Sequence, residues 1–284
     1  MSRCRPVLSR LVVGASLALL CGCPRSGTSF GDTTAWTDAS GPDLDGPAVD
    51  RPRPDRFRWP DLAADRRHKE LEQLRDTALR DALYSLVKGQ SGLSYTKAKS
   101  AMFVPSAGGL DVHDGMIECV YTGIKVPADG TISPGGFNVE HSWPQSEGAD
   151  TAPAEGDLHH LFPAEANANS RRSSLPFGDC ACGGAAPPCK WEQGGSRYGP
   201  SATGGTVFEV RLARRGDIAR AHFYFAVRYK MAIGAEEENA LRVWNTQDLP
   251  DALERERNDA IEGLQNNRNP FVDRPDFVDR ITDF

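Results

Sequence analysis

The 284-residue sequence predicts one folded α+β domain, mixed in class and richer in helix than in sheet. Apolar residues recur at helical spacing over residues 71–86 and again after Asp217. Only short segments, 115–121 and 206–212, are typical of strands. The composition, with 25% charged and 39% hydrophobic residues, fits a soluble globular protein. It excludes a multi-span membrane protein and a wholly disordered chain.

The expected elements can be placed in order, because Gly and Pro mark their ends and alternating apolar residues mark the second strand. The N-terminal half is expected to contain a helix over 71–86 that Gly89 ends, a short helix after Ser94 or Thr96, and a strand over 115–121. A largely looped segment over 123–157 and a loop or clasp over 178–205 come next, and a strand over 206–212 follows the clasp. The C-terminal part is expected to contain a helix from Asp217 and a last helix that Asp248-Leu249-Pro250 opens and that runs to about Leu264.

The first 23 residues are typical of an export signal. Three arginines and no acidic residue lie within the first ten positions, and the apolar run 11–20 is too short to span a bilayer. The run ends in Leu-Cys-Gly-Cys, which resembles a bacterial lipobox and would make Cys23 the lipidated first residue of the mature chain. Cleavage without lipidation is the alternative. We therefore expect an exported protein, either secreted or anchored to a membrane surface and facing the periplasm or the cell exterior.

Residues 24–66 are predicted to be a flexible linker. They are rich in Gly, Pro, Asp and Thr and contain few large apolar residues, so little burial could offset the entropic cost of ordering them. The folded domain is expected to occupy residues 67–284.

The net charge of −6 does not fit a basic protein that coats nucleic acid. The charge is uneven, because residues 171–230 carry ten Lys/Arg against four Asp/Glu, whereas residues 231–284 carry six against thirteen. A local basic region can bind a polyanion, and ordinary solvated surface is the alternative.

Two segments concentrate the side chains that could perform chemistry. Residues 137–146 (FNVEHSWPQS) contain Glu140 and His141, and residues 155–172 contain further acids and histidines, Asn169 and two arginines. A neutral histidine can take a proton from water, carboxylate and amide oxygens suit Mg²⁺ or Ca²⁺, and arginine matches a phosphate. A base, a metal and an arginine together are what hydrolysis of a phosphodiester needs.

The residue types alone are weak support, since a lone histidine is more often structural than catalytic. His159 and His160 are adjacent, so on a strand they would point to opposite faces. The sequence contains no H-E-x-x-H motif, and a zinc protease of that type is not supported.

The ordered motifs resemble the bacterial endonuclease I family, periplasmic or secreted nucleases built around a ββα-metal (His-Me) finger. The matching pieces are Asn-x-Glu-His and Trp-Pro-Gln-Ser within 138–146, Asp-Leu-His-His-Leu and Pro-Ala within 157–164, Asn169 shortly before Arg172, and later pieces at 220–229, 244–245 and 265–273. The resemblance covers about residues 70–280 and implies a mixed, helix-rich domain around the finger.

The resemblance implies that His141 is the general base that activates water. Glu140 and Asn169 would hold one Mg²⁺, with Ca²⁺ or Mn²⁺ as alternatives, and the asparagine would come from the helix of the finger. Glu155 matches a further acidic position at the catalytic site, in the outer shell of the metal or on a bound water. Because Glu140 and His141 would diverge on a regular strand, we expect the strand to end and the backbone to bend there.

The resemblance leaves the basic residues less defined. Arg172 would contact phosphate or form a structural salt bridge, and Arg171 is the neighbouring candidate for binding substrate. His159 would lie behind the metal ligands or be structural. No Arg or Lys lies among the thirteen residues between His141 and Glu155, where some family members place the arginine for the scissile phosphate.

These features predict a metal-dependent, largely non-sequence-specific endonuclease that acts as a monomer on DNA or RNA. A hypothesis from another class is a non-catalytic surface lipoprotein that binds polyanions on the same scaffold. A third is a module stabilised by zinc on its cysteines.

Seven cysteines are present, of which three lie in the first 23 residues. The remaining four are expected to form two disulfides, as is usual in an exported domain. A bond between Cys180 and Cys182 would be strained by their closeness, so Cys119 is expected to pair with one of them and Cys189 with the other.

Overall fold

The computed structural model describes Trp59 and residues 67–284. The predicted signal, the lipobox residue Cys23 and the predicted linker, apart from Trp59, lie outside the described residues. The described residues belong to one compact unit, Pro54–Phe284. No helix in this part of the chain is long and apolar enough to cross a bilayer.

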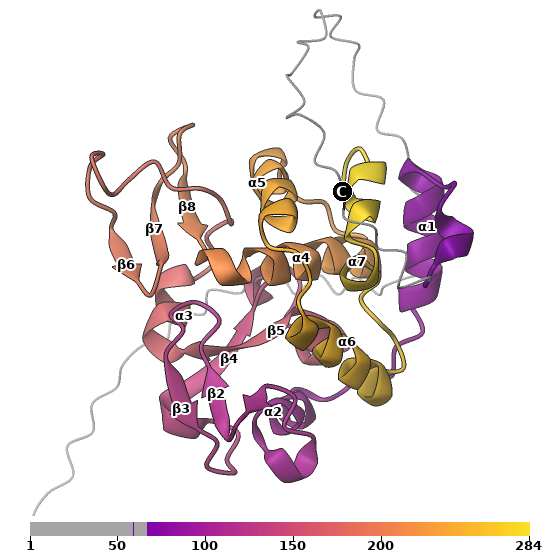
Figure 1. The fold of residues 1–284 in the computed structure, drawn as a ribbon, viewed down its shortest axis with the longest axis horizontal. Coiled ribbons are helices and arrows are strands. Elements are labelled where there is room, and N and C mark those ends of the chain that lie inside the picture. The colour runs from indigo at the N-terminus through magenta and orange to yellow at the C-terminus, as the bar shows by residue number, and fades with distance from the viewer. Residues whose placement is uncertain (1–58, 60–66) are drawn as a thin grey trace, which may run out of the picture. The chain divides into compact units, whose positions relative to one another are not determined.

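The described part of the chain is a mixed α+β fold with small antiparallel sheets, which confirms the predicted class (Figure 1). The helices are α1 (Asp76–Val87), α2 (Tyr95–Phe103), α3 (Ala166–Arg172), α4 (Arg215–Tyr229), α5 (Ala235–Gln247), α6 (Ala252–Gln265) and α7 (Pro270–Asp273). The strands are β1 (Val112–His113), β2 (Met116–Glu118) and β3 (Lys125–Pro127) in one sheet, β4 (Phe137–His141) and β5 (Leu161–Glu165) in a second, and β6 (Trp191–Gln193), β7 (Ser196–Pro200) and β8 (Thr206–Glu209) in a third.

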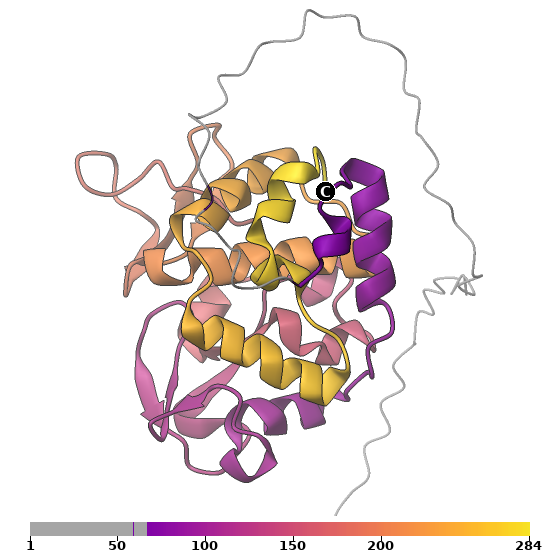
Figure 2. The same cartoon turned by 45° about the vertical axis from the view of Figure 1, so that its right-hand side comes forward.

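Helix α4 forms the centre of the core. Every residue from Gly216 to Val227 is buried, because α4 packs against α1, α5, α7 and the short 3-10 helix Leu158–His160 (η6). In Figure 1, α4 crosses the middle of the fold. In Figure 2 the yellow C-terminal segment lies between α1 and the orange helices. The backbone N–H of Thr282 donates to Asp76 (2.7 Å), which ties this segment to α1.

The β4–β5 hairpin and α3 form a ββα unit. His141 lies opposite Leu161 and Phe137 lies opposite Glu165 in the antiparallel pair, and α3 begins directly after β5. The buried side chains of Phe137 and Val139 anchor β4 to the core. The return strand and helix expected between Glu140 and Asn169 are therefore present.

Several elements differ from their predicted bounds. Helix α5 was not predicted, because it opens on three glutamates and buries only Leu241 and Trp244 as large apolar side chains, so its apolar periodicity is sparse. The expected strand over 115–121 ends after Glu118, because the chain turns there and the N–H of Gly123 donates to the Cys119 carbonyl at 3.0 Å. The last helix starts later than expected, with Asp251 as its cap.

The prediction of two disulfides is wrong. One disulfide joins Cys182 to Cys189, whereas Cys119 and Cys180 are free thiols. Cys119 is fully buried, and its Sγ accepts the backbone N–H of Glu165 at 3.2 Å, which holds it in the core behind β5. The disulfide also removes two of the four thiols that the zinc hypothesis requires.

Reduction of the unfolded mature protein should therefore add two hydrogens, and two thiols should react with an alkylating reagent before any reduction. Mass spectrometry of the alkylated protein measures both. The disulfide closes a short loop with a sequence separation of 7. It should stabilise the fold by only about 2–3 kcal/mol, so the domain should remain folded when reduced. A gain of four hydrogens would instead support the two disulfides predicted from the sequence.

Candidate active site

The imidazole of His141 sits at the end of β4 and is held in one tautomer by the backbone. Its Nε2 lies 3.0 Å from the carbonyl oxygen of Glu155, in the short 3-10 helix Ala154–Gly156 (η5). Because a carbonyl oxygen only accepts hydrogen bonds, Nε2 carries the hydrogen and Nδ1 keeps its lone pair. The ring of His160 packs edge-on against His141, with the centroids 5.4 Å apart.

The surroundings keep His141 neutral. Only 7% of the residue is exposed. Burial, and secondly the neighbouring His160, lower the pKa of His141 to about 3. A neutral imidazole with a free Nδ1 lone pair is the form that can accept a proton from water at neutral pH.

The carboxylate of Glu140 is buried beside this imidazole and is paired with a guanidinium. Arg172 Nη1 lies 3.1 Å from Glu140 Oε1, and Glu140 is 1% exposed. Burial raises the pKa of Glu140 to about 7, and the charge of Arg172 opposes that rise. Strand β4 ends at His141, as expected from the adjacent Glu140 and His141.

The guanidinium of Arg172, for which a salt bridge and a phosphate contact were both predicted, lies in a buried ion pair. Arg172 is 1% exposed and its guanidinium donates to the carbonyl oxygens of His141 (3.2 Å) and Ser142 (2.5 Å). Its charged group also lies 4.4 Å from the centre of the Phe177 ring. The side chain of Arg172 is 2% exposed and lines a small pocket together with Trp143 and His222, whereas Arg171 on the same helix is exposed.

The side-chain amide of Asn169 faces the same strand. Its Nδ2 donates to Asn138 Oδ1 (2.9 Å) and to the carbonyl of Val139 (3.1 Å), next to Glu140. The amide nitrogen is thus occupied, and the amide oxygen is left as an acceptor. Glu140 Oε1, for its part, lies 3.1 Å from Arg172 Nη1 in the ion pair but accepts no hydrogen bond of regular geometry. Two oxygen donors of this kind fit a hard divalent cation that keeps several waters, as Mg²⁺ does.

A buried polar network supports the segment that orients His141. Asp157, fully buried, accepts hydrogen bonds from the hydroxyls of Tyr224 and Tyr229 (both 2.8 Å), from Gln265 Nε2 (2.9 Å) and from the N–H of His159 (3.1 Å). Burial alone would raise the pKa of Asp157, but His159, then His160 and the hydrogen-bond donors, hold it below its usual value.

Both histidines of η6 are buried and bonded to backbone. His159 Nε2 lies 3.2 Å from the carbonyl of Asn267, so His159 has a structural contact, as one of its predicted readings expected. His160 Nε2 lies 2.7 Å from the carbonyl of Ala154. No role was predicted for His160 or Asp157. Both residues lie in the polar segment 155–172, whose residue types do not distinguish supporting groups from reacting ones.

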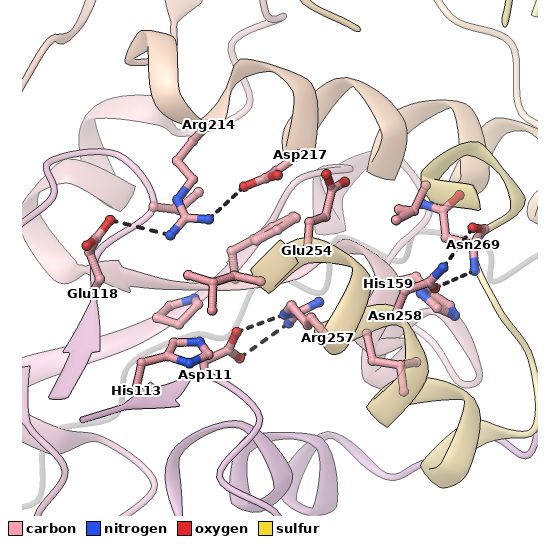
Figure 3. Close-up of a pocket in the computed structure, with 16 residues that line it drawn as sticks. Asp111, His113, Glu118, His159, Arg214, Asp217, Glu254, Arg257, Asn258 and Asn269 are labelled. Atoms are coloured by element: carbon pink, nitrogen blue, oxygen red, sulfur yellow. Dashed lines mark hydrogen bonds and ion pairs between the residues drawn. The ribbon is translucent and has the colours of Figure 1, made fainter. Parts of the chain in front are cut away.

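A separate pocket, shown in Figure 3, lies between α6, β2 and the start of α4. Its charged side chains pair with one another. Arg257 binds Asp111 (2.8 Å), and Arg214 lies between Asp217 (2.9 Å) and Glu118 (3.4 Å). Neither His141 nor the Glu140 carboxylate lines this pocket, so it is not part of the site described above.

A family model described as Endonuclease I matches residues 76–276. The chain belongs to the endonuclease I family. It is therefore a phosphodiester hydrolase, a nuclease of a family that is typically metal-dependent.

Relatives of this endonuclease I family member include nucleases named for both nucleic acids. An extracellular ribonuclease of Bacillus amyloliquefaciens is 32% identical over 247 residues, which is 78% of this chain and 80% of the relative. An extracellular ribonuclease of Bacillus subtilis is 30% identical over 231 residues, 72% of this chain and 74% of the relative. A periplasmic deoxyribonuclease of Aeromonas hydrophila is 32% identical over 125 residues, 42% of this chain and 48% of the relative.

Replacing the buried Asp157 should destabilise the domain. Asp157→Asn removes one acceptor oxygen and points an N–H₂ group at donors, so the free energy of unfolding should fall by about 2–4 kcal/mol. Exposed Asp150→Asn is the control and should change it by less than about 0.5 kcal/mol. Urea denaturation measures both.

The effect of Asp157 should also depend on pH. Its folded pKa lies below the value of 3.8 that applies to the unfolded chain. Its stabilisation is therefore present above that value and is lost as the pH falls through the folded pKa. The stability difference between wild type and Asp157→Asn should narrow in acid, and a gap that widens there would contradict this assignment.

The buried ion pair allows a second stability test. Arg172→Met leaves Glu140 without its counterion and removes donors from two carbonyls, and should lower the free energy of unfolding by about 3–5 kcal/mol. Adding Glu140→Gln should recover part of this loss, because no charge is then left buried. Arg171→Met is the matched control and should be nearly neutral. A stable Arg172→Met variant would refute the structural role.

Proposed function

We propose that this protein is a metal-dependent, largely non-sequence-specific endonuclease in which His141 is the general base. The observation that carries the proposal is the hydrogen bond between His141 Nε2 and the Glu155 carbonyl. It directs the Nδ1 lone pair away from the backbone, in a residue adjacent to a buried carboxylate. The backbone oxygen of Glu155 orients the His141 ring, and the half-buried carboxylate of Glu155 remains a candidate for binding a water molecule.

In the proposed reaction, a water molecule gives a proton to His141 Nδ1 and its oxygen attacks the phosphorus of a phosphodiester. The bond between phosphorus and the leaving sugar oxygen breaks, and that oxygen takes a proton from solvent. The Glu155 carbonyl and the His160 ring hold the imidazole in place throughout. Arg172, by binding the carbonyl of His141, keeps the end of β4 from shifting. A positioned base of this kind accelerates proton transfer by about 10²–10⁴-fold.

Glu140 and Asn169 are the residues that would hold the metal, with Mg²⁺ favoured and Ca²⁺ or Mn²⁺ as alternatives. When bound, the divalent cation would neutralise charge on the phosphate and on the leaving oxygen. The hairpin contributes the carboxylate and α3 contributes the amide, and the bonds of Asn169 to β4 already orient that amide.

The proposed substrate is DNA or RNA, since the relatives are named as ribonucleases and as deoxyribonucleases. Exposed Arg171 is proposed to contact the substrate backbone. We also propose that the protein acts as a monomer outside the cytoplasm, with a lipid on Cys23 tethering it to a membrane surface. The relatives named extracellular or periplasmic support export, and the lipobox-like motif supports the tether.

The base role predicts a loss of turnover in one variant. His141→Ala should lower the rate of nicking of supercoiled plasmid, or of cleavage of an RNA oligonucleotide, by at least about 10²-fold. His113→Ala, which removes an exposed histidine of β1, is the matched control and should cleave at the wild-type rate. Chelation should abolish cleavage by wild type, and Mg²⁺ should restore it.

Two outcomes would overturn parts of this proposal. A wild-type rate for His141→Ala would remove the base role. Pure wild-type protein that binds nucleic acid in the presence of chelator but cleaves neither DNA nor RNA with Mg²⁺ would favour a polyanion-binding protein instead.

A further inference from the structure

Helix α2 lies at the edge of the active site. Its Tyr95 ring packs against the His141 ring with the centroids 5.3 Å apart. The helix also contacts η5, the short helix whose carbonyl orients His141. One side of α2 is buried through Ala98, Ala101, Met102 and Phe103, and Tyr95 and Lys99 are half-buried at the boundary with solvent.

The Tyr95 ring that contacts His141 is uncharged. Burial, followed by the charges of Glu155 and Glu140, raises the pKa of Tyr95. The phenol therefore stays protonated at neutral pH.

Lys99 contacts the same ring. Its Nζ is 4.6 Å from the Tyr95 ring centroid. The two residues are four positions apart on α2, a spacing that places side chains on one face of a helix. Tyr95 thus contacts both the ammonium group and the imidazole of His141.

Lys99 forms no ion pair with a carboxylate among the described residues. The contact of its ammonium group is with the Tyr95 ring. A ring attracts an ammonium without neutralising its charge and leaves its donors free for another acceptor. Arg172 and Arg211 differ from Lys99 in this respect, since Arg172 pairs with Glu140 and Arg211 pairs with Glu118.

We propose that Lys99 binds a backbone phosphate of the substrate beside the scissile bond, and that Tyr95 positions Lys99 against His141. Lys99 would supply the cationic contact that the segment 142–154, which lacks Arg and Lys, does not contain. This inference rests on the proposed endonuclease function and adds a substrate-binding residue to it.

The test compares lysine variants by steady-state cleavage of a defined oligonucleotide, in whichever of DNA or RNA the wild type cleaves. Lys99→Gln should raise KM about fivefold at low salt, with kcat little changed, because one phosphate contact is lost from both ground and transition states. The slope of log kcat/KM against log salt should become shallower by about 0.7–0.9. Lys99→Arg should retain most of both.

Lys97→Gln is the matched control, with the same charge on the same helix. By helical geometry Lys97 lies about 200° around α2 from Tyr95, whereas Lys99 lies about 40° away. The control should therefore leave KM and the salt slope near their wild-type values. Tyr95→Phe, which keeps the ring, should behave like wild type. Tyr95→Leu should raise KM and should make a further Lys99→Gln change nearly silent.

The two proposals fail in different ways. Wild-type KM and salt slope in Lys99→Gln, or equal effects of Lys97→Gln and Lys99→Gln, would overturn the assignment of Lys99 and leave His141 unaffected. A wild-type rate for His141→Ala would overturn the base and leave a Lys99-specific KM effect standing. Circular dichroism and thermal unfolding should show that each variant remains folded.

Discussion

The buried guanidinium of Arg172 joins the parts on which the site depends. It comes from the last residue of α3, neutralises Glu140 of β4, and binds the carbonyls of His141 and Ser142 just where the strand ends. Burying a carboxylate is costly unless a counterion and hydrogen bonds accompany it. The same pair therefore fixes the helix on the hairpin and makes burial of Glu140 beside the proposed base tolerable.

The proposed base depends on a second layer of buried polar groups. The position of η5 sets the direction of the His141 ring, and Asp157 and His160 hold the backbone around η5 in place. The contacts in this layer are to backbone carbonyls and to donors that are buried or partly buried, so a small shift would leave polar groups unpaired. Rigid support of this kind suits a residue that must present one nitrogen to water.

The basic stretch over 171–230 shows why charge counted along a chain does not define a binding surface. Most of its arginines are neutralised within the fold. Besides the pair of Arg172 with Glu140, Arg197 binds Glu209, Arg214 binds Asp217 and Arg220 binds Glu254. The cations proposed to contact a nucleic acid are instead single residues that form no ion pair among the described residues, namely exposed Arg171 on α3 and half-buried Lys99 on α2.

The sequence by itself determined the class of fold, the family, and the motif that carries Glu140, His141 and Asn169, because these depend on residue types at short spacings. Tertiary structure alone decided the rest. It showed that the Arg172 guanidinium is buried against Glu140 and two backbone carbonyls, that Cys119 is enclosed in the core without a disulfide, and that Tyr95 contacts His141 from a helix 46 positions away in the sequence. Such contacts join segments distant in the chain, and local periodicity contains no information about which buried charges and rings will meet.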